Sequence, residues 1–123
     1  MAVLGLTGSI SSAGWVFLGA NSTGQTMYID SSSIRSNGNL VKLWSMGNLP
    51  APKLTTENRE FRSFKGYVEF DCKEEKIRTL AIRLYEKESG KGSIVGVSED
   101  VQGWRAITPG AADALIATVA CNR

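Results

Sequence analysis

Apolar and polar residues follow three different patterns along this chain of 123 residues. The stretch 1–13 consists of apolar and small residues, and no charged residue occurs before Asp30. From residue 14 to about residue 98, segments rich in β-branched and aromatic residues alternate with turn residues, which is typical of β-strands. Near the C-terminus, apolar residues recur at helical spacing instead. We therefore predict a single domain over 14–123, preceded by a separate segment over 1–13.

Six segments carry the strand pattern, and the short turns between several of them indicate an antiparallel sheet. Regular alternation along 76–86 predicts Ile82 on the buried side of its strand and Thr79 and Arg83 on the solvent side. The predicted strands are 15–19, 26–29, 40–46, 64–72, 76–86 and 93–98.

The stretch 50–62 interrupts this pattern. It contains Pro50 and Pro52, followed by the polar run Thr55-Thr56-Glu57-Asn58. Proline cannot donate a backbone hydrogen bond to a sheet, and clustered polar residues favour turns. We expect 50–62 to be an exposed loop.

The C-terminal segment predicts one amphipathic helix that begins near Thr108. Thr108 can act as the N-cap residue, and Pro109 suits the first helical position, where its missing N–H is not needed. Leu115 and Val119 then share an apolar face that needs a partner, and one face of the sheet can supply it. The predicted fold is α+β: a six-stranded antiparallel β-sheet with one C-terminal α-helix packed on one face.

The segment 1–13 has features of an export signal. Its apolar stretch is too short to cross a bilayer as a helix, and it lacks a basic n-region. Small residues at Ser11 and Ala13 match the pattern of a signal-peptidase site. We interpret 1–13 as a signal-peptide remnant, the alternative being a mobile N-terminal arm. The first interpretation predicts a periplasmic or cell-surface location.

The two cysteines are expected to form a disulfide. Cys72 is in phase with Val68 and Phe70 on the buried side of its predicted strand, and Cys121 ends the predicted helix. A bond between them would tie the helix to the sheet. The alternative is two independent buried thiols in a cytosolic protein. The signal-like N-terminus favours the disulfide, because such bonds persist in exported proteins.

Composition excludes several classes of site. The chain has 14 Lys and Arg, 12 Asp and Glu, two Cys and no His. Without His there is no Ser-His-Asp or Cys-His nucleophile and no His-ligated zinc. A net charge of +2 is too small to indicate binding to nucleic acid. We therefore expect no enzymatic activity, no metal, no cofactor and no nucleic-acid partner.

Two groups of charged residues are candidates for a catalytic or a ligand-binding site. Glu69 and Asp71 could form a carboxylate pair, but Arg78 lies close enough to predict a cross-strand ion pair instead. Around 50–62, the basic residues form a candidate ligand-binding patch for an acidic partner. Two glutamates are interleaved among them, and mixed signs favour an ordinary solvated surface. The residues of this candidate patch are Lys53, Arg59, Arg62 and Lys65.

From Trp15 to Cys121 the chain resembles the surface-adhesin protein E family of secreted proteobacterial proteins. Each shared motif is short, and the resemblance rests on their order and on the positions of the two cysteines. The residues that carry it are Trp15-Val16, Tyr28-Ile29-Asp30, Ser33-Ile34-Arg35, Asn37-Gly38, Glu69-Phe70-Asp71-Cys72, Ile77-Arg78-Thr79-Leu80, Trp104, Pro109-Gly110 and Cys121.

The resemblance implies a six-stranded sheet with a C-terminal helix tied on by a disulfide. It also implies an exported adhesin that binds host extracellular-matrix proteins, with a homodimer as a candidate assembly. No lipobox cysteine is present, so no lipid anchor is expected. We therefore expect a non-enzymatic secreted binding module with a protein partner. The alternative is a periplasmic structural or assembly component of the cell envelope that acts as a dimer.

Overall fold

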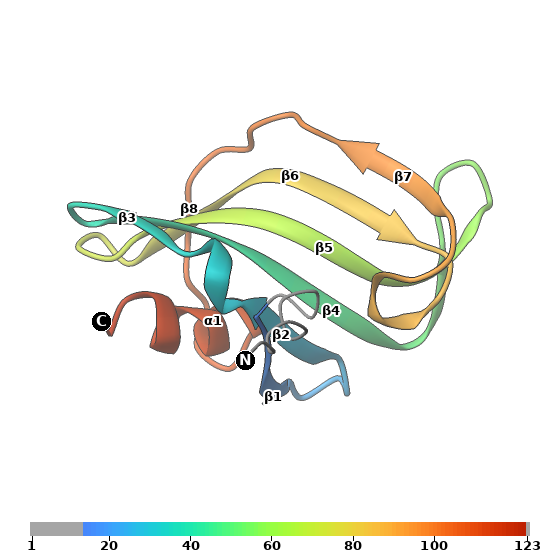
Figure 1. Cartoon of the computed structure of the whole chain (residues 1–123), viewed down its shortest axis with the longest axis horizontal. Helices are drawn as coiled ribbons and strands as arrows, with labels where there is room; N and C mark the ends of the chain where they lie inside the picture. The colour runs from blue at the N-terminus through green and yellow to red at the C-terminus, as the bar shows by residue number, and fades with distance from the viewer. Residues whose placement is uncertain (1–13, 123) are drawn as a thin grey trace, which may run out of the picture.

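The structure is a computed structural model that describes residues 14–122 (Figure 1). The segment 1–13, interpreted above as a signal-peptide remnant or mobile arm, lies outside the described residues. The strands are β1 (Trp15–Ala20), β2 (Thr26–Asp30), β3 (Arg35–Asn37), β4 (Leu40–Leu54), β5 (Glu60–Asp71), β6 (Lys76–Tyr85), β7 (Ile94–Ser98) and β8 (Arg105–Ala106). The helical elements are the short 3-10 helices η2 (Ser31–Ser33) and η3 (Glu88–Gly90) and the α-helix α1 (Ala112–Ala120).

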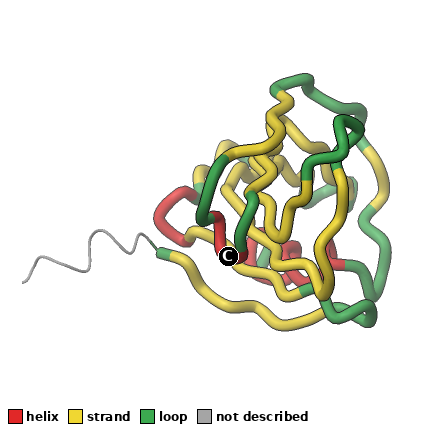
Figure 2. Tube along the Cα trace, turned by 90° about the vertical axis from the view of Figure 1, so that its right-hand side faces the viewer, coloured by secondary structure: helices red, strands yellow, loops and turns green. Residues whose placement is uncertain are grey.

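The strands form one antiparallel sheet in the order β1-β2-β4-β5-β6-β7, with β3 added beside β4 and β8 beside β6. This confirms the predicted six-stranded sheet and its single C-terminal helix. Figure 1 shows α1 lying against the sheet near β2 and β4, and Figure 2 shows that the sheet is strongly curved. The helix therefore covers one face only.

The hydrophobic core lies between α1 and the sheet. Its buried side chains come from β2, β4, β5, β6 and α1, because strand alternation directs every second residue to this side. Phe70, Leu43 and Ile77 are fully buried at its centre, and Ile116 and Ala120 are the buried residues of the helix. The buried members of the core are Met27, Ile29, Val41, Leu43, Val68, Phe70, Ile77, Ile116 and Ala120.

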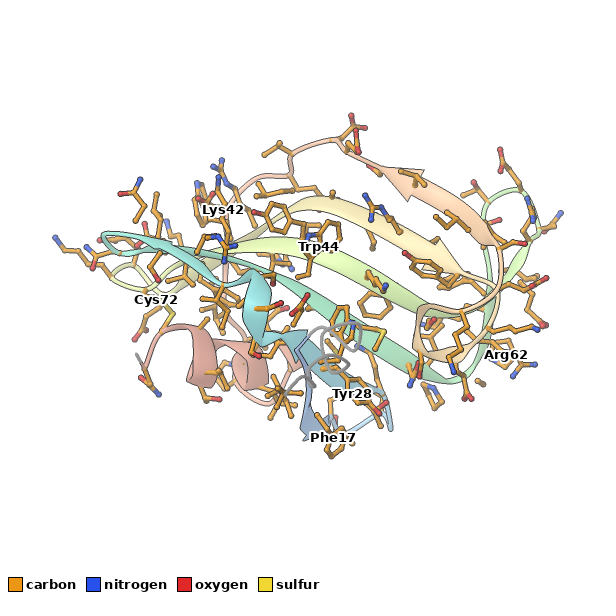
Figure 3. All side chains as sticks on the ribbon, viewed as in Figure 1. Phe17, Tyr28, Lys42, Trp44, Arg62 and Cys72 are labelled. Atoms are coloured by element: carbon orange, nitrogen blue, oxygen red, sulfur yellow. A yellow bond between two sulfur atoms is a disulfide. The ribbon has the colours of Figure 1, made fainter. Side chains whose placement is uncertain are left out.

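A disulfide joins the end of the helix to the sheet. Cys72 directly follows β5, Cys121 caps the C-terminus of α1, and their Cα atoms are 5.4 Å apart. The bond lies at one end of the sheet, where Figure 3 labels Cys72 above the helix. The predicted pairing is confirmed, and the alternative of two independent thiols is wrong.

The stretch 50–62 is exposed as predicted, but the prediction that it forms a loop is wrong. β4 continues to Leu54 and β5 begins at Glu60, so only the intervening residues form a turn, closed by a hydrogen bond from the Thr55 N–H to the Arg59 carbonyl. The register between β4 and β5 shifts between Asn48 and Lys53. Both prolines fall within this irregular stretch, where a strand tolerates a residue that cannot donate to its neighbour.

The predicted alternation of β6 is wrong in its first half. Tyr67 pairs with Ala81, whereas the next residue, Val68, pairs with Thr79, so Leu80 is an extra residue in a β-bulge. Thr79 therefore lies on the core side, opposite Val68, rather than on the solvent side. Beyond the bulge, Ile82 lies on the core side and Arg83 on the solvent side, as predicted.

The helix begins later than the sequence predicts. Its N-cap is Ala111 and its first residue is Ala112, not Thr108 and Pro109. Gly110 has φ of +83°, a left-handed conformation that no right-handed helix can include. The residues before it therefore form a turn that leads into α1.

Removing the disulfide should destabilise the protein. Replacing both Cys72 and Cys121 by Ala should lower the free energy of unfolding by about 4 kcal/mol, because the bond closes a loop with a sequence separation of 49 residues. Urea denaturation followed by tryptophan fluorescence measures this change. Reductant should lower the wild-type midpoint and leave the variant unchanged. A wild-type midpoint that reductant does not move would contradict the assignment.

Candidate functional site

The two faces of the sheet differ in chemistry. One face is covered by α1; the opposite face, which we call the open face, carries all three tryptophans and all three tyrosines of the chain. Cross-strand partners point to the same side of a sheet, so Trp44 of β4 and Tyr67 of β5 lie together there. Their chain neighbours Leu43 and Val68 are partners in the core. Alternation along β4 and β5 thus separates an aromatic face from an aliphatic core.

Aromatic rings on the open face pack against one another across the strands. The rings of Trp44 and Tyr67 are stacked, with centroids 5.0 Å apart and an interplanar angle of 29°. The rings of Phe17 on β1 and Tyr28 on β2 have centroids 5.3 Å apart and an interplanar angle of 57°. Pairs of this kind contribute about 0.5–1.5 kcal/mol beyond the area that they bury. The rings are therefore held in place by the sheet itself.

Two cations lie among these rings. The Nζ atom of Lys65 is 5.3 Å from the ring centroids of both Trp15 and Tyr85. The guanidinium carbon of Arg83 is 4.8 Å from the ring of Trp44. A cation over an aromatic face is attracted by the electron density of the ring. Both basic side chains are half-buried, so they are ordered parts of this face.

One end of the open face holds a buried ion pair. The Nε and Nη2 atoms of Arg78 lie 2.8 Å and 2.7 Å from the same carboxylate oxygen of Glu69, whose side chain is only 4% exposed. Arg78 also lies over the ring of Trp104, at 4.5 Å. The predicted cross-strand ion pair is confirmed for Glu69. The Glu69 carboxylate therefore neutralises the charge of Arg78 and has a structural role in the sheet.

The other end of the open face is covered by the connection between β6 and β7, which contains η3. The Ser63 hydroxyl donates a hydrogen bond to the Lys87 carbonyl and accepts one from the Gly90 N–H at 2.9 Å. Gly90 has φ of +71°, and a Cβ at this position would lie 2.7 Å from Cε of Lys65. The left-handed φ favours glycine here, and the absence of a Cβ lets the Lys65 side chain lie close to this backbone.

The structure does not bring the four predicted basic residues together. Lys53 lies at the end of β4, Arg59 in the turn that follows, and Arg62 in β5, paired with Glu60 at 3.6 Å. Lys65 is three residues further along β5, so alternation turns it away from the side that Arg62 occupies. Figure 3 shows Arg62 at the end of the sheet far from Cys72, with Trp44 between them.

Sequence reasoning missed Arg83 as a neighbour of Lys65. At the β5–β6 turn Asp71 pairs with Lys76, and counting back from that pair would place Ile82 opposite Lys65. The bulge at Leu80 moves the register by one residue, so that Arg83 is opposite Lys65 instead. The turn was recognisable in the sequence, but no sequence signal marked the bulge.

Other kinds of site receive less support. Over residues 14–122, no group of three or more His, Cys, Asp or Glu side chains is placed to hold a metal ion. A cavity of about 450 Å³ adjoins the disulfide, with Cys72, Ile107 and Ala117 in its lining. In the same part of the chain, no helix has the length and apolar character needed to span a membrane. The open face thus remains the most distinctive surface.

Comparison with known proteins relates this fold to one family. A family model described as surface-adhesin protein E matches residues 15–122. A solved structure of Haemophilus influenzae protein E has a TM-score of 0.62 and 21% identity, covering 90% of this chain and 89% of that chain. Its crystal form II has a TM-score of 0.68 at 19% identity, covering 89% and 88%. Protein E from non-typeable Haemophilus influenzae has a TM-score of 0.64 at 21% identity, covering 99% and 82%. No curated protein matches this chain in sequence.

Separating Arg78 from Glu69 should destabilise the fold far more than breaking an exposed ion pair. Arg78→Met leaves a buried carboxylate without its cation and should lower the free energy of unfolding by about 3 kcal/mol. Arg62→Met is the matched control, because its pair with Glu60 is exposed and should contribute less than about 1 kcal/mol. Urea denaturation compares the two variants, and equal losses would contradict the structural role of Glu69.

Proposed function

Because the chain belongs to the surface-adhesin protein E family, we propose that it is a non-enzymatic, exported module that binds a protein partner through the open face of its sheet. The observation that carries the proposal is the collection of all tryptophans and tyrosines on this face. Tyrosine, tryptophan and arginine are the residue types enriched in the energetic centres of protein interfaces.

The open face combines fixed rings with exposed apolar side chains. Phe17 on β1 is 57% exposed, Val97 on β7 is 60% exposed, and Trp104 is partly exposed near β8. Rings that are already ordered lose little conformational entropy on binding. This arrangement supports a preformed contact surface that does not require loop closure.

We place the protein in the periplasm or at the cell surface, with a host extracellular-matrix protein as its partner. The disulfide supports export, because bonds of this kind persist in oxidising compartments. The family supports adhesion as the activity. Lys53, Arg59 and Arg62 at the end of the β4–β5 hairpin stay a predicted accessory contact, separate from the open face.

A second candidate function is that of a periplasmic structural or assembly component of the cell envelope that acts as a dimer. The observation that favours it is the edge strand β7, which pairs with β6 on one side. Ile94 and Val97 of this strand are both exposed. An edge strand with exposed apolar side chains can pair with a second copy.

Removing the tryptophan ring of β4 from the open face should weaken partner binding. Trp44→Ala deletes the ring that contacts both Tyr67 and Arg83, so we expect at least a tenfold loss of affinity. Surface plasmon resonance on immobilised laminin and vitronectin measures it. Leu54→Ala is the control, because Leu54 is an exposed apolar residue at the hairpin end. The affinity of this variant should stay within about twofold of the wild-type value. Wild-type protein retained by neither ligand would contradict matrix binding.

The dimer is tested independently of any ligand. If β7 pairs with a second copy, Val97→Lys should convert the dimer to a monomer, because a lysine on an edge strand opposes pairing. Light scattering coupled to size-exclusion chromatography measures the mass. A wild-type monomer over the whole concentration range would exclude the second candidate.

A further inference from the structure

Two positive charges are placed directly opposite each other on the open face, next to the end that the β6–β7 connection covers. Lys65 of β5 is the cross-strand partner of Arg83 of β6, and both side chains point away from α1. Like charges in this relation destabilise a sheet. Among residues 14–122, the ion pairs involve Arg62, Arg78 and Arg105. Neither Lys65 nor Arg83 has a carboxylate partner there, so their repulsion is uncompensated within the described chain.

We infer that Lys65 and Arg83 form an anion-binding site that receives the carboxylate of an acidic segment of the protein partner. This inference rests on the proposed function, because it names the chemistry by which the open face recognises its partner. A carboxylate placed between the two cations would accept hydrogen bonds from both and would remove their repulsion.

The surroundings prepare both cations for an anion. Lys65 lies between the rings of Trp15 and Tyr85, and Arg83 lies over the ring of Trp44. A guanidinium stacked on a ring keeps its N–H donors in its own plane, where they remain available to a carboxylate. Half-buried charges also interact more strongly than charges in bulk water. The rings thus position the two cations and leave their N–H donors available to an anion.

The buried carboxylate of the open face is already engaged. Glu69, four residues along β5 from Lys65, is bound to Arg78. In the register of the sheet, Met46 is opposite Lys65 on the β4 side and Val97 is opposite Arg83 on the β7 side. The row therefore reads apolar, cation, cation, apolar across four strands, and no ion pair of residues 14–122 supplies an anion to it.

This row favours an acidic peptide segment over a sulfated polysaccharide. A highly charged polysaccharide needs an extended series of cations, whereas here two cations are bordered by apolar side chains such as the exposed Val97. A carboxylate with apolar neighbours in its own sequence matches both features. Sulfated polysaccharide is kept as an alternative outcome of the test.

The test uses the intact disulfide-bonded protein and its own tryptophan fluorescence, because Trp15 and Trp44 contact the two cations. The first probe is a short capped peptide that alternates leucine and glutamate. The second replaces every glutamate by glutamine, and the third is a heparin-derived oligosaccharide. We expect the glutamate peptide to bind about tenfold more tightly than the glutamine peptide, and salt to weaken only the former. Equal binding of the two peptides would overturn the inference.

Variants then locate the site. Lys65→Gln with Arg83→Gln should weaken the glutamate peptide about tenfold or more and leave the glutamine peptide unchanged. Lys73→Gln with Lys76→Gln removes the same charge from the exposed β5–β6 turn and should change affinity by less than about twofold. An equal loss in both double variants would show an effect of net charge and overturn the site. Tighter binding of the oligosaccharide, lost in the first double variant, would overturn the peptide assignment.

Folding and function are separated by two further readouts. The salt dependence of the wild-type protein tests the charge requirement even if a variant is unstable, because it needs no substitution. On immobilised laminin and vitronectin, a Lys65 and Arg83 variant that binds normally while Trp44→Ala does not would overturn this inference and leave the proposed function standing. Normal binding by all variants would overturn both.

Discussion

The packing of α1 against one side of the sheet is the constraint on which the rest of the structure depends. Because successive residues of a strand point to opposite sides, burying Leu43 and Phe70 under the helix sends Trp44 and Glu69 to the open face. The disulfide at the end of α1 holds the helix covalently on this side of the sheet. Core and open face are therefore two results of one alternation.

The open face must be stable without a covering layer. Its rings stack in pairs, its cations lie over rings, and its one buried carboxylate is held by two hydrogen-bonding atoms of Arg78. These contacts stabilise the open face, whereas the core side chains are stabilised by burial under α1. The opposed Lys65 and Arg83 are the exception, because their placement weakens the sheet. Proteins break a local rule of this kind mainly at functional sites, and this placement is the basis of the anion-binding site that we infer.

Much of the fold was predictable from local pattern, and the errors have common causes. The strands, the helix and the Cys72–Cys121 bond follow from alternation and helical spacing, which reflect burial directly. The sequence predicts a loop over 50–62 because proline disfavours a strand, whereas the register shift in β4 accommodates both prolines. Of the candidate patch, only Lys65 joins the aromatic face. Its neighbours Arg59 and Arg62 are close in sequence but point elsewhere or lie at the far end of the sheet.

The sequence by itself determined the class of fold, the covered side of β5 and the family, because these depend on residue type and spacing within one segment. Only the tertiary structure decided which side chains meet on the open face. The pairing of Lys65 with Arg83 depends on the bulge at Leu80, which shifts the register of β6 against β5 by one residue. A bulge arises from the fit between two strands and their twist, so no single segment encodes it.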